Sequence, residues 1–346
     1  MAYSILLNGD SVVSSDYFGF SLIDPVVTQE VNTAGSFTFI LPHDHPIADR
    51  ILIRKTLISV KDGNDFIFYG FVASTTEDFF GNTRVSCEGS FAFLNDTIQR
   101  PRTWTNMDLR QFVQGVINTH NNVVPNSQRI SLGETNWITD ETISVSADYD
   151  ITMDFLMSNT ISKFGGYFAQ RMVGTRMYID WIQNITGQTN QSVALGVNAL
   201  DITKDINAVD LFNVALPLGK DKLTISSVNS GSDVLINQES VDAFGYVMKV
   251  LNFPDIENAA QLKAAGQKAL STGRLENLSV NVKAVDLTLA GENFDKIKLL
   301  DMVHVVSGPH GLDTYMPVTK MQTYLNAPER NTIMLGKTAK KGISRR

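Results

Sequence analysis

The sequence predicts an α+β protein in which β-strands predominate. Three observations predict this class: short strand-like runs separated by Gly, Asn or Pro over residues 32–94, helical patterns between residues 103 and 195, and strand patterns that return from about residue 196 with one helix among them. A chain of 346 residues exceeds what one hydrophobic core usually serves. We therefore expect about two to four compact units.

The composition is typical of a soluble globular chain, with 43% hydrophobic, 9% aromatic and 19% charged residues. The sequence has no apolar run near the roughly 18 residues that cross a bilayer. Residues 1–10 lack the basic and long apolar regions of a signal peptide, and Cys87 is the one cysteine. We expect a protein that is made and folded in the cytoplasm of its host cell, without disulfides and without membrane insertion.

Charge is unevenly distributed along the sequence. The formal net charge is −7, but the last ten residues carry five basic side chains and no acidic one. The rest of the chain has 24 basic and 36 acidic side chains, a formal charge of −12. Because gripping a phosphate backbone needs clustered Lys and Arg, nucleic-acid binding is not expected as the main task. The basic tail, residues 338–346, is expected to be a solvated, disordered end, with an anion or partner contact as the alternative.

Residues 1–102 are predicted to form a first β-barrel domain. From Arg84 to Leu94, apolar or small residues alternate with mostly polar ones, which puts one face of a strand in a core and the other toward water. The inner face would be formed by Val85, Cys87, Gly89, Phe91 and Phe93. The pattern changes from period two to period 3.6 after residues 99–102, so we expect the domain boundary at about residue 102.

Residues 103–195 are predicted to form an α+β domain with two amphipathic helices. Thr105 would cap the first helix, with Asp108 in its first turn, and the helix would end at residues 121–122. Its buried face would comprise Leu109, Phe112, Val113, Val116 and Ile117. The second helix would end at residues 165–166, with a stripe formed by Met153, Leu156, Met157, Thr160, Ile161 and Phe164. Residues 173–174 would then turn a hairpin between 167–172 and 175–181, on which both helices would pack.

A second β-barrel domain is expected to comprise residues 196–225 and 275–337. The alternation of Leu278, Val280, Val282 and Ala284 with polar residues, and the runs MVHVVSG, YMPVTKMQTYL and NTIMLG, predict its strands. Residues 226–274 would form an inserted hairpin and helix subdomain. Asn258 would cap the inserted helix, which would bury Ala259, Leu262, Ala265, Ala269 and Leu270 and end before Gly273.

Two stretches resemble the trimeric baseplate hub family of tailed phages, which includes the hub part of tail-associated lysin, or prophage tail endopeptidase, proteins. The first stretch comprises Asn32, Gly35, Ser36, Phe37, Phe39, Leu41, Pro42, His45 and Pro46, then Phe68, Tyr69, Gly70 and Val72, then residues 89–94. The second comprises LNFPDIENAAQLKAAGQKAL, LSVNVKAVDLTLAG, KIKLLDMVHVVSGPHGL and APERNTIMLGK. The resemblance spans about residues 5–337 and rests on the order of these packing patterns.

This resemblance implies a structural role at the tip of a phage or prophage tail. Each chain would have two related tail-tube-like β-barrels, and a homotrimer would form a pseudo-sixfold ring around the tail channel. Implied partners are the tail tube or distal tail protein and the tail fibre or tip proteins, with DNA only as cargo passing through. The location would be the virion tail tip, after assembly in the bacterial host cytoplasm. The residues agree on two points, because edge-rich sheets need neighbours and an acidic body repels passing DNA.

Many proteins of this family continue into a peptidase or cell-wall hydrolase domain. Here the last strand is expected to end at about Gly336, and ten residues follow it. We therefore expect no enzyme in this chain and a separate tail fibre or lysin protein to supply any hydrolase. An alternative is a tail-associated endopeptidase or cell-wall hydrolase with its site in residues 103–275.

A search for catalytic, cofactor and metal sites predicts none. His43, Asp44 and His45 are suitable zinc ligands, but adjacent residues on one turn rarely complete a site. Cys87 is expected in the core, and Gly336–Thr338 lacks the earlier glycine of a phosphate loop, where Asn331 stands. No GxSxG or HExxH motif is present.

Two weaker candidates concern carbohydrate. The acid pairs Asp148 with Asp150 and Asp140 with Glu141 would suit a glycosidase, but loop positions near a helix start are expected instead. Trp104, Trp137 and Trp181 would stack on sugars in a saccharide-binding module if they were exposed, although core or interface packing is expected. Host-surface saccharide binding remains a further alternative.

Overall fold

The computed structural model describes residues 3–11, 21–136, 142–194, 197–207, 211–254, 256–272, 277–284 and 295–336. Contacts divide the described chain into two compact units. Unit 1 lies within residues 1–203 and 281–335, and unit 2 lies within residues 204–280 and 336–346. The chain is therefore discontinuous in unit 1, because unit 2 is inserted between its parts.

The main sheet of the molecule is mostly antiparallel and contains thirteen described strands. Seven lie in the N-terminal part: β1 (Tyr3–Leu7), β2 (Asp10–Ser11), β3 (Ile23–Glu30), β4 (Ser36–Leu41), β5 (Leu57–Asp62), β6 (Asp65–Glu77) and β7 (Thr83–Gly89). Six come from later residues: β15 (Gln188–Ala194), β16 (Ala199–Asn207), β20 (Asn277–Ala284), β21 (Met302–Ser307), β22 (Leu312–Tyr324) and β23 (Thr332–Gly336). The alternation predicted for β20–β23 therefore identified true strands.

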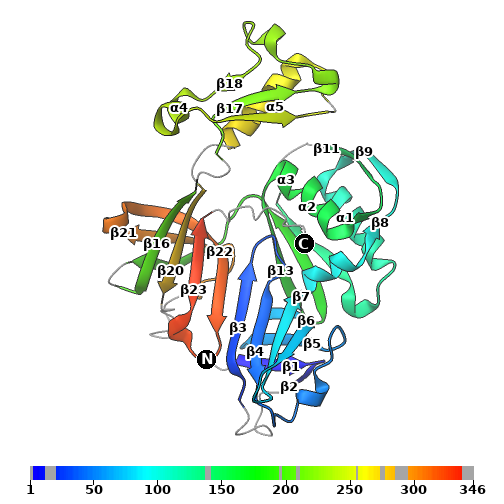
Figure 1. The fold of residues 1–346 in the computed structure, drawn as a ribbon, viewed down its shortest axis with the longest axis vertical. Coiled ribbons are helices and arrows are strands. Elements are labelled where there is room, and N and C mark those ends of the chain that lie inside the picture. Colours follow the sequence, from blue (N-terminus) through cyan, green and yellow to red (C-terminus); the bar gives the residue numbers. More distant parts are fainter. Residues whose placement is uncertain are drawn as a thin grey trace. The chain divides into compact units, whose positions relative to one another are not determined.

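The strands follow the order β16-β20-β23-β22-β3-β4-β7-β6-β5-β1-β2, with β21 beside β22 and β15 beside β21 in parallel (Figure 1). Within the described residues this path stays open, so the two closed barrels expected from the sequence are not present there. The physical reason is the antiparallel pairing of β3 with β22, which joins strands nearly 300 residues apart into one sheet. The predicted predominance of β-strands is confirmed, whereas the predicted closed barrels are not present among the described residues.

The alternation predicted for the seventh strand is correct up to Gly89. Val85 and Cys87 are buried on the inner face of β7, opposite Phe39 and Phe37 of β4. Gly89 is required because a Cβ there would lie 1.7 Å from the Ala34 carbonyl oxygen. From Ser90 to Asp96 the chain forms a 3-10 helix instead of a strand, since the buried run Phe91–Leu94 turns inward on consecutive residues.

The α+β part of unit 1 contains a three-stranded sheet in the order β10-β14-β13 and three helices. Its elements are β8 (Ile98–Gln99), β9 (Arg102–Asp108), α1 (Leu109–Asn121), β10 (Ile130–Thr135), β11 (Thr142–Ala147), β12 (Asp150–Ile151), α2 (Thr152–Asn159), α3 (Ile161–Phe164), β13 (Tyr167–Val173) and β14 (Arg176–Ile182). The five predicted apolar residues of α1 are all buried. They share a core with Phe71, Phe91, Trp104 and Trp181, so one apolar core includes residues on both sides of residue 102.

Three local predictions in this part need correction. Asp108, not Thr105, caps α1: its carboxylate accepts a 3.0 Å hydrogen bond from the Gln111 amide, while Thr105 lies in β9. The second helix breaks at Thr160, whose φ of −119° and ψ of −81° separate α2 from α3. The hairpin turn comprises residues 174–175 because Val173 pairs with Arg176.

Unit 2 is a three-stranded sheet with a helix packed on one face (Figure 1). Its elements are β17 (Val214–Leu218), β18 (Leu235–Ile236), α4 (Gln238–Phe244), β19 (Met248–Asn252) and α5 (Ala259–Thr272). The predicted cap is confirmed, because Asn258 accepts hydrogen bonds from the amides of Ala260 and Gln261 at 2.9 and 3.1 Å. The hairpin expected within residues 226–274 is not formed by the strands described there: β18 and β19 both pair with β17, β19 in parallel, and α4 lies between them. None of the described helices is long and apolar enough to cross a membrane.

The predicted insertion, residues 226–274, lies inside unit 2. The boundaries predicted at residues 102 and 195 stay predictions, and the tail at 338–346 lies outside the described residues.

Candidate functional site

The metal candidate does not form a site in the described structure. His45 is buried, and its Nδ1 accepts a hydrogen bond from the Ile47 amide at 3.3 Å. His43 and Asp44 are exposed, with 3.9 Å between Nδ1 and Oδ1. Among the residues that the structure describes, no group of three His, Cys, Asp or Glu side chains is placed to hold a metal ion. His43 and His45 therefore occupy different environments on one turn.

Cys87 lies in the core, as predicted. It is surrounded by apolar side chains from the N-terminal strands of the main sheet, and desolvation by this burial raises the pKa of its thiol. A thiol nucleophile reacts as the thiolate, so Cys87 is unsuited to that role.

The acidic pairs and the phosphate-loop candidate do not form a site among the described residues either. Asp148 and Asp150 are exposed at the turn before α2, where the Asp150 carboxylate accepts a 2.9 Å hydrogen bond from the Asp148 amide. Asp140 and Glu141 lie outside the described residues. Gly336 ends β23, and Lys337 and Thr338 also lie outside them.

The tryptophans do not offer a sugar platform where they are described. Trp104 and Trp181 are 1% and 0% exposed, and the Trp181 indole donates a 3.1 Å hydrogen bond to the Gly165 carbonyl. Trp137 lies outside the described residues. Core packing is therefore the structural role of both described tryptophans.

The structure brings together two hydroxyl–imidazole pairs that sequence reasoning missed. Ser307 Oγ and His310 Nδ1 are 2.7 Å apart in the turn between β21 and β22, and Thr97 Oγ1 lies 2.9 Å from His120 Nδ1. Ser307 and Thr97 are 1% and 8% exposed, so a peptide bond cannot reach either hydroxyl. The spacing Ser-Gly-Pro-His was a visible signal for the first pair, whereas the second joins residues 23 apart. Both pairs stabilise local structure.

Two pockets lie in unit 1. One has a volume of about 30 Å³, roughly the space of a single water, beside Phe68, Gln170 and Met172. The other, of about 190 Å³, is lined by Leu41, Ala48, Ile51, Thr75, Glu77 and Thr83. Glu77 is the only titratable residue in that lining, and a lone carboxylate supplies no acid–base pair.

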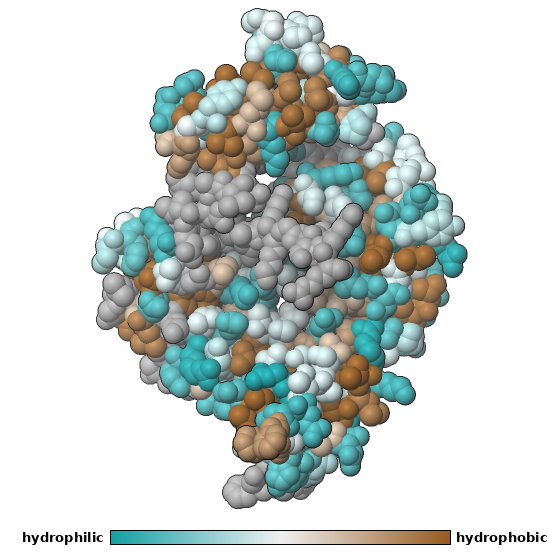
Figure 2. Space-filling model, in the orientation of Figure 1, coloured by the Kyte–Doolittle hydropathy of each residue, from teal (hydrophilic) through white to brown (hydrophobic). Residues whose placement is uncertain are grey.

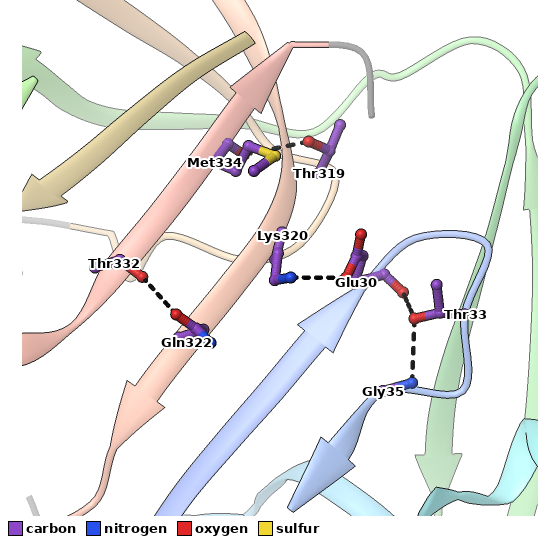
Figure 3. Close-up of polar contacts among 8 residues, drawn as sticks. All are labelled: Glu30, Thr33, Gly35, Thr319, Lys320, Gln322, Thr332 and Met334. Carbon is purple, nitrogen blue, oxygen red and sulfur yellow. Dashed lines mark hydrogen bonds and ion pairs between the residues drawn. The ribbon is translucent and has the colours of Figure 1, made fainter. Parts of the chain in front are cut away.

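The best-defined polar arrangement lies where the N-terminal and C-terminal strands meet (Figure 3). Glu30 of β3 forms a 3.0 Å ion pair with Lys320 of β22, and the two residues are direct partners across the strands. Thr33 donates to the Glu30 carbonyl at 3.1 Å and accepts from the Gly35 amide at 3.2 Å, which shapes the turn after β3. The Glu30–Lys320 pair therefore crosses the junction of β3 with β22, and the Thr33 contacts fix the turn between β3 and β4.

Unit 2 presents an open apolar surface. Ala215 and Leu235 of the sheet pack with Leu262 of α5 in one buried cluster. Register and the pleat place Ile236, Met248 and Val250 on the opposite face, where they are 51%, 46% and 47% exposed. Apolar side chains also gather over unit 2 in Figure 2. An apolar face without a cover is typical of an interaction surface.

Comparison with known proteins gives one family match and several fold matches. Residues 187–344 match the family described as prophage endopeptidase tail. No curated protein sequence matches the chain significantly.

Solved structures match the fold over nearly the whole chain. The 43 kDa tail protein of prophage MuSo2 from Shewanella oneidensis has 13% identity and a TM-score of 0.65, covering 97% of this chain and 98% of that one. The tail protein from Neisseria meningitidis MC58 has 12% identity and a TM-score of 0.65, covering 97% of each chain. The E. coli c3393 protein has 9% identity and a TM-score of 0.55, covering 97% of this chain and 77% of that one. That protein is a component of the type VI secretion system with structural similarity to the T4 bacteriophage tail proteins gp27 and gp5.

The family match over the C-terminal part and the fold matches over the whole chain lead to one conclusion. Residues 187–344 match the prophage endopeptidase tail family, and the whole chain has the fold of solved phage and prophage tail proteins.

Proposed function

We propose that this tail protein is a structural baseplate hub at the tip of a phage or prophage tail. Three copies form a ring around the tail channel, and the ring connects the tail tube or distal tail protein to fibres and other tip components. The observation that carries this proposal is the match of the entire fold, at 97% and 98% coverage, to a prophage tail protein. Similarity to c3393, itself similar to T4 gp27 and gp5, supports the same assignment.

The surfaces of the chain support assembly with neighbours. Ile236, Met248 and Val250 form an exposed apolar face, and within the described residues β19 pairs with β17 and lies at the edge of the small sheet. Apolar faces and strand edges of this kind are covered when copies of a chain pack in a symmetric assembly. In the proposed ring, a second copy of the chain covers this face.

The charge of the chain supports DNA as cargo and not as ligand. Without its last ten residues the chain has a formal charge of −12. A negative channel wall repels the phosphate backbone and lets DNA pass without strong binding. We propose that assembly takes place in the bacterial host cytoplasm and that DNA meets the hub only in transit.

We also propose that the chain is not an enzyme. Zymography on bacterial cell walls tests this directly, with His43→Ala, His45→Ala and Asp148→Ala compared with the wild type. No clearing by any of these proteins is expected. Clearing by the wild type that disappears in a folded His43→Ala or Asp148→Ala protein would favour the endopeptidase or cell-wall hydrolase alternative.

The oligomeric state tests the hub. Native mass determination is made on the purified chain alone and after mixing with the tail proteins encoded beside it. A trimer is expected in the mixture, and the isolated chain can remain monomeric because docking on a symmetric template strengthens a weak ring by multivalency. A chain that stays monomeric in both samples would contradict the proposed ring.

A further inference from the structure

The turn that joins β6 to β7, residues 78–82, presents two aromatic rings to solvent. Phe79 is 95% exposed and Phe80 is 76% exposed. Their ring centroids are 5.4 Å apart at an interplanar angle of 86°, so the rings meet edge to face. Single exposed apolar residues are ordinary on a protein surface, but two adjacent phenyl rings at such exposure form a concentrated apolar point. We call these two residues the aromatic tip.

The backbone beneath the aromatic tip is fixed by a network centred on Asp78. Its Oδ1 accepts hydrogen bonds from the amides of Phe80 and Asn82 at 2.8 and 2.9 Å, and its Oδ2 accepts one from Asn82 Nδ2 at 3.0 Å. The Asp78 amide donates to the Asn82 carbonyl at 2.9 Å, and Gly81 adopts a φ of +81°. The tip is therefore preorganised, which lowers the entropy lost when it binds.

The surroundings of the aromatic tip are acidic. Glu77 and Asp78 precede it directly, and the hydrogen bond from the Asn82 side chain lowers the pKa of Asp78, so this carboxylate stays charged at neutral pH. Asp44 is on the adjoining turn, where a Cβ built on Gly81 would lie 3.1 Å from His43 Cβ. Arg84, paired across the strands with Thr76, is the one nearby cation on the hairpin, against these three acids.

We propose that the aromatic tip inserts into an apolar pocket of another protein, and that Lys or Arg side chains rim this pocket. Two rigid phenyl rings supply the buried centre of such a contact, and the acids supply its charged border. An anionic lipid surface would repel the same acids. Self-association through the tip is one of the outcomes that the test below distinguishes. The inference does not depend on the trimeric ring.

Quantitative binding tests the proposal, with each structural tail protein encoded beside this chain purified as a probe. We expect one of them to bind the wild-type chain, with a dissociation constant raised at least about tenfold by Phe79→Ala and by Phe80→Ala. Glu77→Gln should lower the association rate and its dependence on salt, because Glu77 contributes charge outside the Asp78 network. Val123→Ala, which truncates an apolar side chain that is 70% exposed elsewhere in unit 1, is the matched control and should bind like the wild type. Benzoylphenylalanine placed at position 80 should cross-link to an apolar segment of that protein flanked by Lys or Arg.

Four results would overturn the proposal. They are the absence of binding to any of these proteins, equal binding by the wild type and both alanine variants, tip-dependent binding to vesicles of phosphatidylcholine and phosphatidylglycerol at roughly 7:3, and self-association that the alanine variants abolish. Circular dichroism and thermal melting of each variant verify folding, which the exposed tip substitutions should leave unchanged. The trimeric ring is tested separately by the native mass measurement, so failure of the tip proposal and failure of the ring can be told apart.

Discussion

At the scale of single residues, His120 shows how burial turns a polar side chain into a structural element. Its Nε2 donates to the Gln128 carbonyl at 3.1 Å, because a carbonyl only accepts, and its Nδ1 contacts the Thr97 hydroxyl at 2.9 Å. Thr97 and Gln99 in turn bond the Thr152 hydroxyl at 2.9 and 3.0 Å. Desolvation lowers the pKa of His120, so the fold favours the neutral ring.

This pKa shift predicts a loss of stability in acid. The unfolded chain binds the proton of His120 more readily than the folded chain, so the stabilisation is complete above about pH 6.5 and decreases as pH falls below it. Urea unfolding at about pH 7.5 and pH 5.5 should show a drop in the unfolding free energy of the wild type that is smaller in His120→Gln. The exposed His43→Ala serves as the control and should follow the wild type. Parallel pH dependence in the wild type and His120→Gln would contradict this account.

The two buried tryptophans provide a matched pair for a second prediction. Trp181 Nε1 is bonded to the Gly165 carbonyl, whereas Trp104 Nε1 has no hydrogen-bond partner among the described residues. Replacement by Phe removes the same volume at each site, but only Trp181→Phe breaks a hydrogen bond. We expect Trp181→Phe to lower the free energy of unfolding by about 1 kcal/mol more than Trp104→Phe does. Equal losses in chemical denaturation would show that the Trp181 bond contributes nothing net.

At the scale of elements, two residues near the start of α1, Thr105 and Asp108, are both of a type that caps helices, and only Asp108 does so in the structure. The Asp108 carboxylate accepts a hydrogen bond from the Gln111 amide, whereas Thr105 lies three residues earlier in β9. Asp108→Ala should cost about 0.5–2 kcal/mol of unfolding free energy, because a helix N-terminus loses the acceptor for its amide. Thr105→Ala, the control on an exposed strand position, should change stability little. If urea denaturation showed a larger loss of unfolding free energy for Thr105→Ala than for Asp108→Ala, Thr105 would be the cap, as the sequence predicted.

The junction of β3 with β22 supports a prediction about pairing. Glu30 and Lys320 are 25% and 28% exposed in their side chains and lie 3.0 Å apart. A double-mutant cycle with Glu30→Gln and Lys320→Met should give a coupling energy of about 0.2–1 kcal/mol. High salt should reduce this energy. Zero coupling at low salt would mean that the backbone ladder alone holds the junction.

The elements also show which predictions a sequence supports. Period-two alternation identified β7 and β20–β23, and period 3.6 identified α1 and α5, because each pattern reports which side chains face a core. The 3-10 helix at Ser90–Asp96 escaped notice because its consecutive apolar residues continue the strand composition. The parallel pairing of β17 with β19 was missed because α4 lies between them and its sequence resembles a strand.

At the scale of the whole molecule, long-range pairing was beyond sequence patterns. Nothing local in β3 or β22 specifies that they are neighbours, and this pairing replaces two expected barrels with an open sheet in the described residues. The candidate site residues were likewise predictable only where a local pattern reported their environment. Cys87 was predictable as core from its strand face, and Trp104 and Trp181 were expected in a core or interface, but the burial of His45 was not predicted.

The central claim, a trimeric hub around a channel, is tested most directly by cryo-electron microscopy of the chain alone and mixed with the tail proteins encoded beside it. We predict a ring with threefold symmetry around a pore, in the mixture if not in the isolated sample. Particles that remain single copies in both samples, or that assemble without a central pore, would contradict the hub.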